Sequence, residues 1–126
     1  MTRFLGFAIA ALLAYPIPAL ADNWVSVAEG DDGTNYVNTD SIEKKGNIAW
    51  YWTYTVFQTP DADGVFSFAA YESTDCVRKV VRLRQYIEYD KSRQVMFSME
   101  PGDSGPLVKI NPGTSGEAVF KFVCSR

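Results

Sequence analysis

Three arginines, four and then two residues apart, are the residues whose chemistry is most readily stated. Arg78, Arg82 and Arg84 alternate with apolar residues, and this spacing places them on one face of a strand. A planar guanidinium group binds carboxylate, sulfate or phosphate through paired hydrogen bonds. The three arginines are therefore a candidate binding site for an anionic partner. The alternative is that they pair with acidic residues across strands and only solvate the outer face.

Catalytic chemistry is restricted because the 126 residues include no histidine. Histidine supplies the base of Ser-His and Cys-His catalytic pairs and is a common metal ligand. The segment 102–106, of sequence GDSGP, resembles the nucleophile motif of trypsin-like proteases with one glycine missing, but Ser104 has no histidine to accept its proton. We therefore expect no catalytic residue, no metal site and no cofactor.

The carboxylates are spread over turns rather than gathered in one motif. Asp61, Asp63 and Gly64 hint at a calcium loop, but the closing glutamate of such a loop is absent, so we interpret the segment as an acidic turn. Glu72 and Glu88 lie in segments that would form adjacent strands. A pair of carboxylates at that place would suit a small hydrolase or lyase.

Residues 1–21 have the pattern of a secretory signal peptide. Arg3 precedes an apolar run, and the segment 19–21 supplies the small residues that signal peptidase recognises. The run is shorter than the roughly 20 apolar residues that span a bilayer. We expect cleavage after Ala21, export to the periplasm or the cell surface, and a single mature domain over residues 22–126 with no membrane span.

Export also determines how the two cysteines are interpreted. Cys76 and Cys124 are the only cysteines of the sequence, and thiols of exported proteins are commonly oxidised to disulfides. We therefore predict that they are bonded to each other. A metal site or a catalytic thiol is the alternative, but two cysteines without histidine do not complete a zinc site or a Cys-His pair.

The charge balance of the chain is mildly acidic. The sequence has 12 Lys and Arg residues against 15 Asp and Glu residues, which gives a net charge of −3. A negative net charge supplies no long-range attraction for a polyanion such as DNA or RNA. We therefore expect no nucleic-acid partner.

Several segments have the alternation, or the β-branched and aromatic content, that is typical of strands. Clusters of Gly, Pro, Asn and Asp separate these segments and predict turns. A sheet of about five or six antiparallel strands is ordinary for a domain of this size. The predicted strands are residues 23–29, 47–57, 65–72, 76–89, 94–99 and 107–110.

The C-terminal segment has a different periodicity. Thr114 and Glu117 match a capping box, and apolar residues then follow at helical spacing up to Cys124. A strand over residues 117–124 is the alternative, because Phe120 and Phe122 also alternate. We prefer a short helix, packed on one face of the sheet and tethered by the disulfide, and thus an α+β fold.

This fold predicts which side chains are buried. The face that carries Tyr51 and Phe57 is interpreted as core if the helix packs there, and as a contact patch if it does not. We prefer core for these two residues. The side chains expected to be mostly buried, beneath Phe122 and Val123, are Trp50, Trp52, Tyr54, Val77, Val81, Leu83 and Ile87.

Several short motifs occur in a characteristic order along the mature chain. They are Trp24, the segment 36–42 (YVNTDSI), the Gly46-Asn47 turn, Asp75-Cys76 followed by Arg82, the segment 110–114 (INPGT) and the terminal Val123-Cys124. In this order and spacing the sequence resembles the surface-adhesin protein E family of bacterial exported proteins. It departs from the family pattern at Leu107, where a tryptophan is expected, and in having no lipoprotein cysteine at the mature N-terminus.

The resemblance implies an antiparallel sheet with a C-terminal helix tethered by the disulfide. It also implies a non-enzymatic binding role, which in pathogens is adhesion to host extracellular proteins. We therefore expect an exported binding protein whose partner is a host protein, an envelope protein or an anionic polymer. The alternative is a small periplasmic hydrolase or lyase that uses carboxylates.

Overall fold

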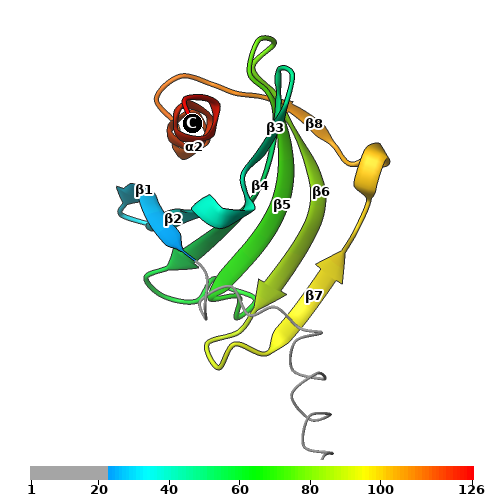
Figure 1. The fold of residues 1–126 in the computed structure, drawn as a ribbon. Coiled ribbons are helices and arrows are strands. Elements are labelled where there is room, and N and C mark those ends of the chain that lie inside the picture. The colour runs from blue at the N-terminus through cyan, green and yellow to red at the C-terminus, as the bar shows by residue number, and fades with distance from the viewer. Residues whose placement is uncertain (1–22) are drawn as a thin grey trace, which may run out of the picture.

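Antiparallel pairing joins eight strands into one sheet within residues 23–126, the part of the chain that the structure, a computed structural model, describes (Figure 1). The path across the sheet is β1-β2-β4-β5-β6-β7, while β3 pairs with β4 and β8 pairs with β6. The predicted signal peptide, residues 1–21, lies outside the described residues. The strands are β1 (Trp24–Gly30), β2 (Gly33–Asn38), β3 (Glu43–Lys45), β4 (Ile48–Phe57), β5 (Ser67–Asp75), β6 (Val80–Tyr89), β7 (Val95–Met99) and β8 (Leu107–Lys109).

The prediction of five or six strands was too low, because two strands escaped the sequence patterns. Strand β2 reads GTNYVN and is mostly polar or small, so it gives little of the β-branched and aromatic signal. Strand β3 is three exposed charged residues, Glu43–Lys45. They are extended because they pair with β4 in a hairpin. The local sequence pattern of three charged residues does not predict that pairing.

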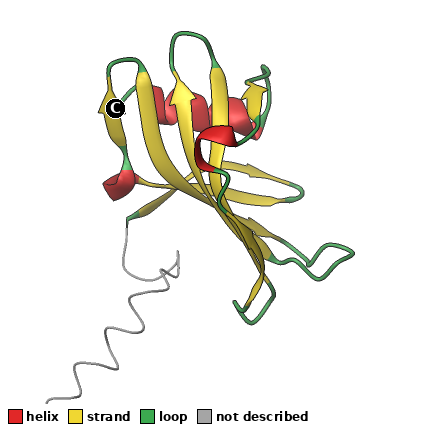
Figure 2. Ribbon diagram, turned by 90° about the vertical axis from the view of Figure 1, so that its right-hand side faces the viewer, coloured by secondary structure: helices red, strands yellow, loops and turns green. Residues whose placement is uncertain are grey.

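The C-terminal helix is confirmed as α2 (Ser115–Cys124). Thr114 caps its N-terminus: the backbone N–H of Glu117 donates to Thr114 Oγ1 at 3.2 Å, and the Glu117 carboxylate accepts from the backbone N–H of Gly113, the residue before the cap, at 3.0 Å. The first of these bonds satisfies a donor that the first turn of a helix leaves free. The helix lies across the concave side of the curved sheet (Figure 2).

The predicted disulfide is also confirmed. Cys76 follows the end of β5 and Cys124 is the last residue of α2, and their Cα atoms are 5.8 Å apart. A helix of about three turns is unstable on its own in water. The disulfide therefore holds one end of α2 against the sheet, while Val119 and Val123 bury its apolar side.

The helix covers the Tyr51 face of β4. Tyr51 is 1% exposed and packs with Val37, Ala49, Val119 and Val123, which confirms the interpretation of Tyr51 as core. The prediction that α2 covers the other face of β4 is wrong, because both faces of this strand carry aromatic residues and alternation alone does not say which one a helix occupies. The residues wrongly placed beneath the helix are Trp50, Trp52 and Tyr54.

A bulge in β6 changes the facing of the longest predicted strand. Tyr71 pairs with Gln85, but the next residue of β5 pairs with Leu83, so Arg84 has no partner position in the ladder. The extra residue shifts the alternation, and Ile87 packs with the residues of the face opposite α2. Val77 is 67% exposed because it lies in the turn before β6, contrary to its predicted burial.

Candidate functional site

The structure separates the three arginines of the candidate site. Arg78 is exposed in the turn between β5 and β6, where its backbone N–H donates to the Asp75 carboxylate at 2.9 Å. Arg82 lies on β6 and donates from Nη1 to the carbonyl oxygen of Gly105 at 2.8 Å. Arg84 lies at the bulge of the same strand. Arg78 is therefore free to meet a partner, whereas Arg82 is already bound within the fold.

Arg84 is enclosed by contacts from three other parts of the chain. Its Nε donates to Ser73 Oγ on β5 at 3.0 Å, and its Nη1 forms an ion pair with the carboxylate of Asp103. Its guanidinium group also lies over the ring of Trp50, 4.4 Å from the centroid. The acidic partner of Arg84 thus comes from the segment after β7 and not from a neighbouring strand.

The GDSGP segment has a structural part in this arrangement. Residues Gly102–Ser104 form a 3-10 turn between β7 and β8. A Cβ atom on Gly105 would lie 1.7 Å from the carbonyl oxygen of Leu83, so no larger residue fits against β6 there. The segment brings the carboxylate of Asp103 to Arg84 and the carbonyl group of Gly105 to Arg82.

The carboxylates of Glu72 and Glu88 do not converge. Glu72 pairs with Leu83 and Glu88 pairs with Phe68, so the two glutamates are four residues apart along the sheet, about 13 Å at the rise of a strand. Asp61 is used within its own loop, where its carboxylate accepts from the backbone N–H groups of Asp63 and Val65 at 2.9 Å.

Glu72 does lie in an unusual place, a cavity of about 200 Å³ between α2 and the sheet. Its cross-strand neighbour is Tyr51, whose hydroxyl group is hydrogen-bonded to Thr74. Burial raises the pKa of Glu72 to about 7, while a hydrogen bond from Tyr51 lowers it. Burial also raises the pKa of Tyr51 well above its usual value. The cavity thus holds an acid that is easily protonated, but no second carboxylate lines it.

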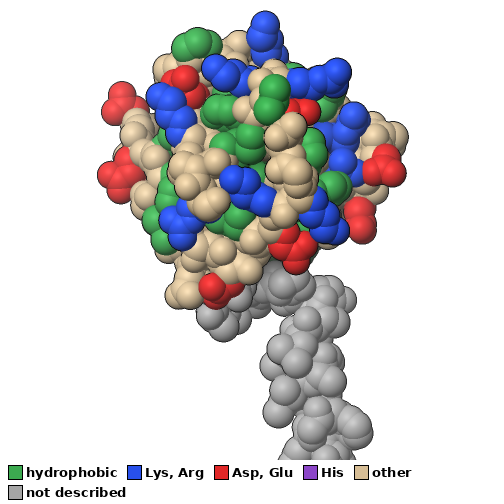
Figure 3. Space-filling view, turned by 45° about the horizontal axis from the view of Figure 1, so that its top comes forward, with side chains coloured by type: hydrophobic (Ala, Val, Ile, Leu, Met, Phe, Trp, Pro, Cys, Tyr) green, Lys and Arg blue, Asp and Glu red, His purple; other side chains and the backbone are tan. Residues whose placement is uncertain are grey.

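Basic residues gather at one end of the sheet, which we call the basic end. This end contains the β3–β4 turn, the β5–β6 turn, the end of β8 and the C-terminus of α2. Figure 3 shows Lys and Arg side chains around a central group of apolar ones on this side of the molecule. The residues of the basic end are Lys44, Lys45, Arg78, Lys79, Lys109 and Arg126.

Most charges of the basic end are not neutralised inside the protein. The two ion pairs within residues 23–126 are Arg84–Asp103 and Lys121–Glu117, and neither uses a residue of the basic end. Lys44 donates from Nζ to the carbonyl oxygen of Cys124 at 3.0 Å, where a cation stabilises the C-terminus of the helix.

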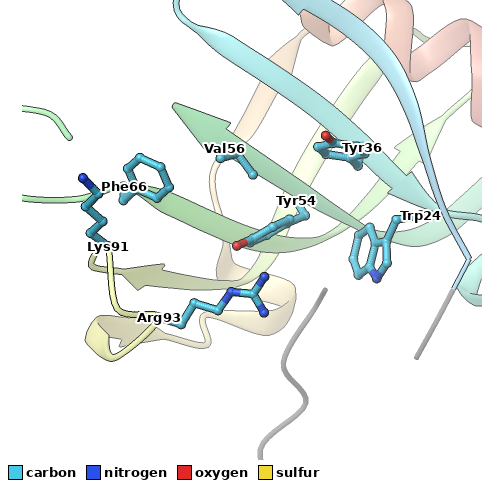
Figure 4. Close-up of a pocket in the computed structure, with 7 residues that line it drawn as sticks. All are labelled: Trp24, Tyr36, Tyr54, Val56, Phe66, Lys91 and Arg93. Carbon is cyan, nitrogen blue, oxygen red and sulfur yellow. The ribbon is translucent and has the colours of Figure 1, made fainter. Parts of the chain in front are cut away.

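The opposite end of the sheet carries a pocket of about 400 Å³ on the face away from α2 (Figure 4). Its wall comes from β1, β2, β4, the segment just before β5 and the turn between β6 and β7. Trp24 and Tyr54 are in contact at the base of this wall, with ring centroids 5.8 Å apart. The lining residues are Trp24, Tyr36, Tyr54, Val56, Phe66, Lys91 and Arg93.

The candidate surfaces are set on a curved antiparallel sheet, and the one α-helix within residues 23–126 is held to it by a disulfide. The sequence matches the surface-adhesin protein E family over residues 24–125, and the chain belongs to that family. It is thus a surface-adhesin-like binding protein. No helix within residues 23–126 is long and apolar enough to cross a bilayer.

Solved structures of Haemophilus influenzae protein E share the fold. Crystal form II of that protein has a TM-score of 0.57 and 11% sequence identity, with 88% of this chain and 94% of that chain covered. Protein E from non-typeable Haemophilus influenzae has a TM-score of 0.55 and 11% identity, with 88% and 82% covered. Comparison with curated protein sequences finds no match.

Sequence reasoning missed both the basic end and the aromatic pocket. Each is assembled from turns and strands that are distant in sequence, for example Lys45 with Lys109, or Trp24 with Arg93. The available signal was the position of the charges relative to the turns, since alternate turns of a meander lie at the same end of a sheet.

Proposed function

We propose that this protein is an exported, non-enzymatic adhesin that contacts an acidic partner protein through its basic end. One observation carries the proposal: the charges of the basic end lie together, exposed and outside the ion pairs of residues 23–126. The net charge of the chain is −3, so the positive charge of the basic end is local and does not reflect the charge of the whole surface. A positive patch of this kind attracts and orients an acidic surface.

The three arginines of the sequence hypothesis have different roles in this proposal. Arg78 belongs to the basic end, and its exposed guanidinium group is available to a carboxylate of the partner. Arg82 and Arg84 are bound to Gly105 and Asp103, so neither is available for direct contacts, and the charge of Arg84 is balanced by Asp103.

A charge variant tests the basic end. In the variant Lys45→Gln, Arg78→Gln, Lys79→Gln, Lys109→Gln the side chains keep most of their length but lose four charges. Immobilised poly-glutamate serves as the acidic probe at low salt. We expect the native protein to be retained and to elute as salt rises, because exposed charges are screened over about 10 Å at 0.1 M salt. The charge variant should pass through unretained.

The matched control removes two cations from the opposite end, Lys91→Gln and Arg93→Gln, and should be retained almost as well as the native protein. Equal retention of the charge variant and the native protein would refute the basic end as the contact surface. Thermal unfolding of each variant checks that the fold is intact, since exposed charges of this kind contribute little stability individually.

Surface display is part of the proposed function and has its own test. Protease is added to intact cells that express the protein, and the loss of full-length protein is followed by immunoblot, with a known periplasmic protein as the internal control. We expect loss of the protein while the control remains. Protection of both would place the protein in the periplasm and would contradict a role in adhesion.

A further inference from the structure

The pocket at the end opposite the basic end has a composition that the proposed function does not use. Its wall is apolar and aromatic, and its charged groups are the two cations Lys91 and Arg93. None of its lining residues is acidic. This composition differs from that of the surrounding turns, which carry Asp31, Asp61 and Asp63.

The aromatic wall is held rigidly by the sheet. Tyr54 is 7% exposed and donates from its hydroxyl group to Ser67 Oγ at 3.0 Å. Its ring contacts Trp24 on one side and Tyr89 on the other, with centroids 5.8 and 6.4 Å away. These rings are already held in place by the fold. A flat apolar group that enters the pocket therefore packs on them without the entropic cost of ordering the side chains.

The two cations are positioned by the geometry of the turn. The carboxylate of Asp90 accepts from the backbone N–H groups of Ser92 and Gln94 at 2.8 and 2.9 Å. Arg93 has a φ of 67°, a left-handed conformation that glycine would adopt at lower cost. In Figure 4 the side chain of Arg93 extends from this turn toward the aromatic residues.

We propose that this pocket binds a small amphipathic anion, a molecule with an apolar aromatic or acyl body and one carboxylate, sulfonate or phosphate group. The body would lie against Trp24, Tyr54 and Val56, and the anionic group would face Lys91 and Arg93. The volume of about 400 Å³ is in the range of small-molecule sites. A neutral polar ligand fits less well, because the wall offers few hydrogen-bonding groups and the Tyr54 hydroxyl is already engaged.

A pair of fluorescent probes separates the apolar body from the charge. The probe 1-anilinonaphthalene-8-sulfonate carries an anionic group, whereas N-phenyl-1-naphthylamine has the same ring body without it. Both are titrated into the folded protein. In the variant Lys91→Gln, Arg93→Gln we expect the sulfonate probe to bind about tenfold more weakly, because hydrogen bonds to charged groups are lost. The affinity for the neutral probe should change by less than about twofold.

A second variant tests the location of the ring body. Val56→Trp places a large side chain in the pocket and should weaken both probes, while Lys45→Gln, Arg78→Gln at the basic end should change neither. Near-ultraviolet circular dichroism verifies the fold of each variant. If Val56→Trp unfolds, the variant Lys91→Gln, Arg93→Gln still tests the proposal, because its substitutions are in an exposed turn. Unchanged sulfonate binding in the Lys91 and Arg93 variant would overturn the proposal.

Competition then tests the class of ligand. Dodecanoate should displace the sulfonate probe from the native protein, whereas dodecyltrimethylammonium, with the same chain and the opposite charge, should not. Equal displacement by the two would show that charge plays no part and would also overturn the proposal. The substitutions in the pocket and those at the basic end lie at opposite ends of the sheet. Failure of the ligand proposal for the pocket therefore leaves the proposed contact through the basic end intact, and the reverse also holds.

Discussion

The guanidinium group of Arg84 lies over the indole ring of Trp50, with its Cζ atom 4.4 Å from the ring centroid. Arg82 pairs with Ser73, the residue of β5 that pairs with Trp50. Alternation therefore turns Arg84, two residues further along β6, toward the face that carries Trp50. The same guanidinium group binds Ser73 and Asp103. Arg84 thus links β4, β5 and the segment after β7.

Replacement of this residue should therefore cost stability. We expect Arg84→Gln to lower the free energy of unfolding by about 1–2 kcal/mol, from the loss of a cation–π contact and charged hydrogen bonds. Urea unfolding measures the change. The control Arg78→Gln, at an exposed turn, should lie within about 0.5 kcal/mol of the native protein. Equal stability of the two variants would contradict a structural role for Arg84.

Gly105 should be among the least tolerant positions of the chain. In Gly105→Ala the new Cβ atom meets the backbone of Leu83, which a rotamer change does not relieve. We expect a loss of about 3 kcal/mol, at the upper end of the effects of overpacking. The matched control is Gly30→Ala, where nothing lies within 4 Å of the added atom. Thermal unfolding of both variants measures the difference.

The stability of the protein should fall as pH rises through neutrality. Burial raises the folded-state pKa of Glu72 from 4.5 to about 7, so the folded protein binds this proton more tightly than the unfolded chain does. The contribution of Glu72 is therefore fully present below about pH 4.5 and is lost as pH rises to about 7, by up to about 3 kcal/mol.

Glu72→Gln isolates this contribution. The variant should unfold at higher urea concentration than the native protein at pH 8, and its stability should depend less on pH between pH 5 and 8. Glu100→Gln, at an exposed position, should keep the pH dependence of the native protein. A native protein that is equally stable at both pH values would show that Glu72 keeps its usual pKa.

Loss of the disulfide should destabilise the fold as a whole. Cys76→Ser, Cys124→Ser opens a loop with a sequence separation of 48 residues, for which the loop-entropy model gives about 4 kcal/mol. Reduction of the native protein should reproduce the loss, and mass spectrometry of non-reduced peptides identifies the bond. Reduced and oxidised protein of equal stability would contradict the contribution assigned to it.

Much of the architecture could be predicted from the sequence, because its signals are local. The capping box at Thr114 and the apolar spacing after it identified α2, and an isolated pair of cysteines in a chain that was expected to be exported identified the disulfide. The face covered by the helix and the facing of β6 could not be predicted. The first depends on packing between distant elements, and the second on a bulge at Arg84 that no local pattern marks.

The candidate sites were predicted less completely for the same reason. Alternation grouped Arg78 with Arg82 and Arg84, but the turn that precedes β6 separates Arg78 from the strand. The ion pair of Arg84 comes from Asp103, a residue of the segment dismissed as a chance protease motif. The sequence interpretation considered this segment only for catalysis and did not predict its structural role.

Both edges of the sheet are interrupted, which bears on how the protein behaves at high concentration. The outer edge of β6 is shared by β7 and β8, strands of five and three residues separated by a turn with a proline on either side. The other edge is formed by β1, which has an irregularity between Ser26 and Ala28, and by the three-residue strand β3 beside β4. Straight, continuous edges are the templates on which sheets of different molecules join and fibrils grow. Short and broken edges should let this protein accumulate, crowded among its own copies, without aggregating strand to strand.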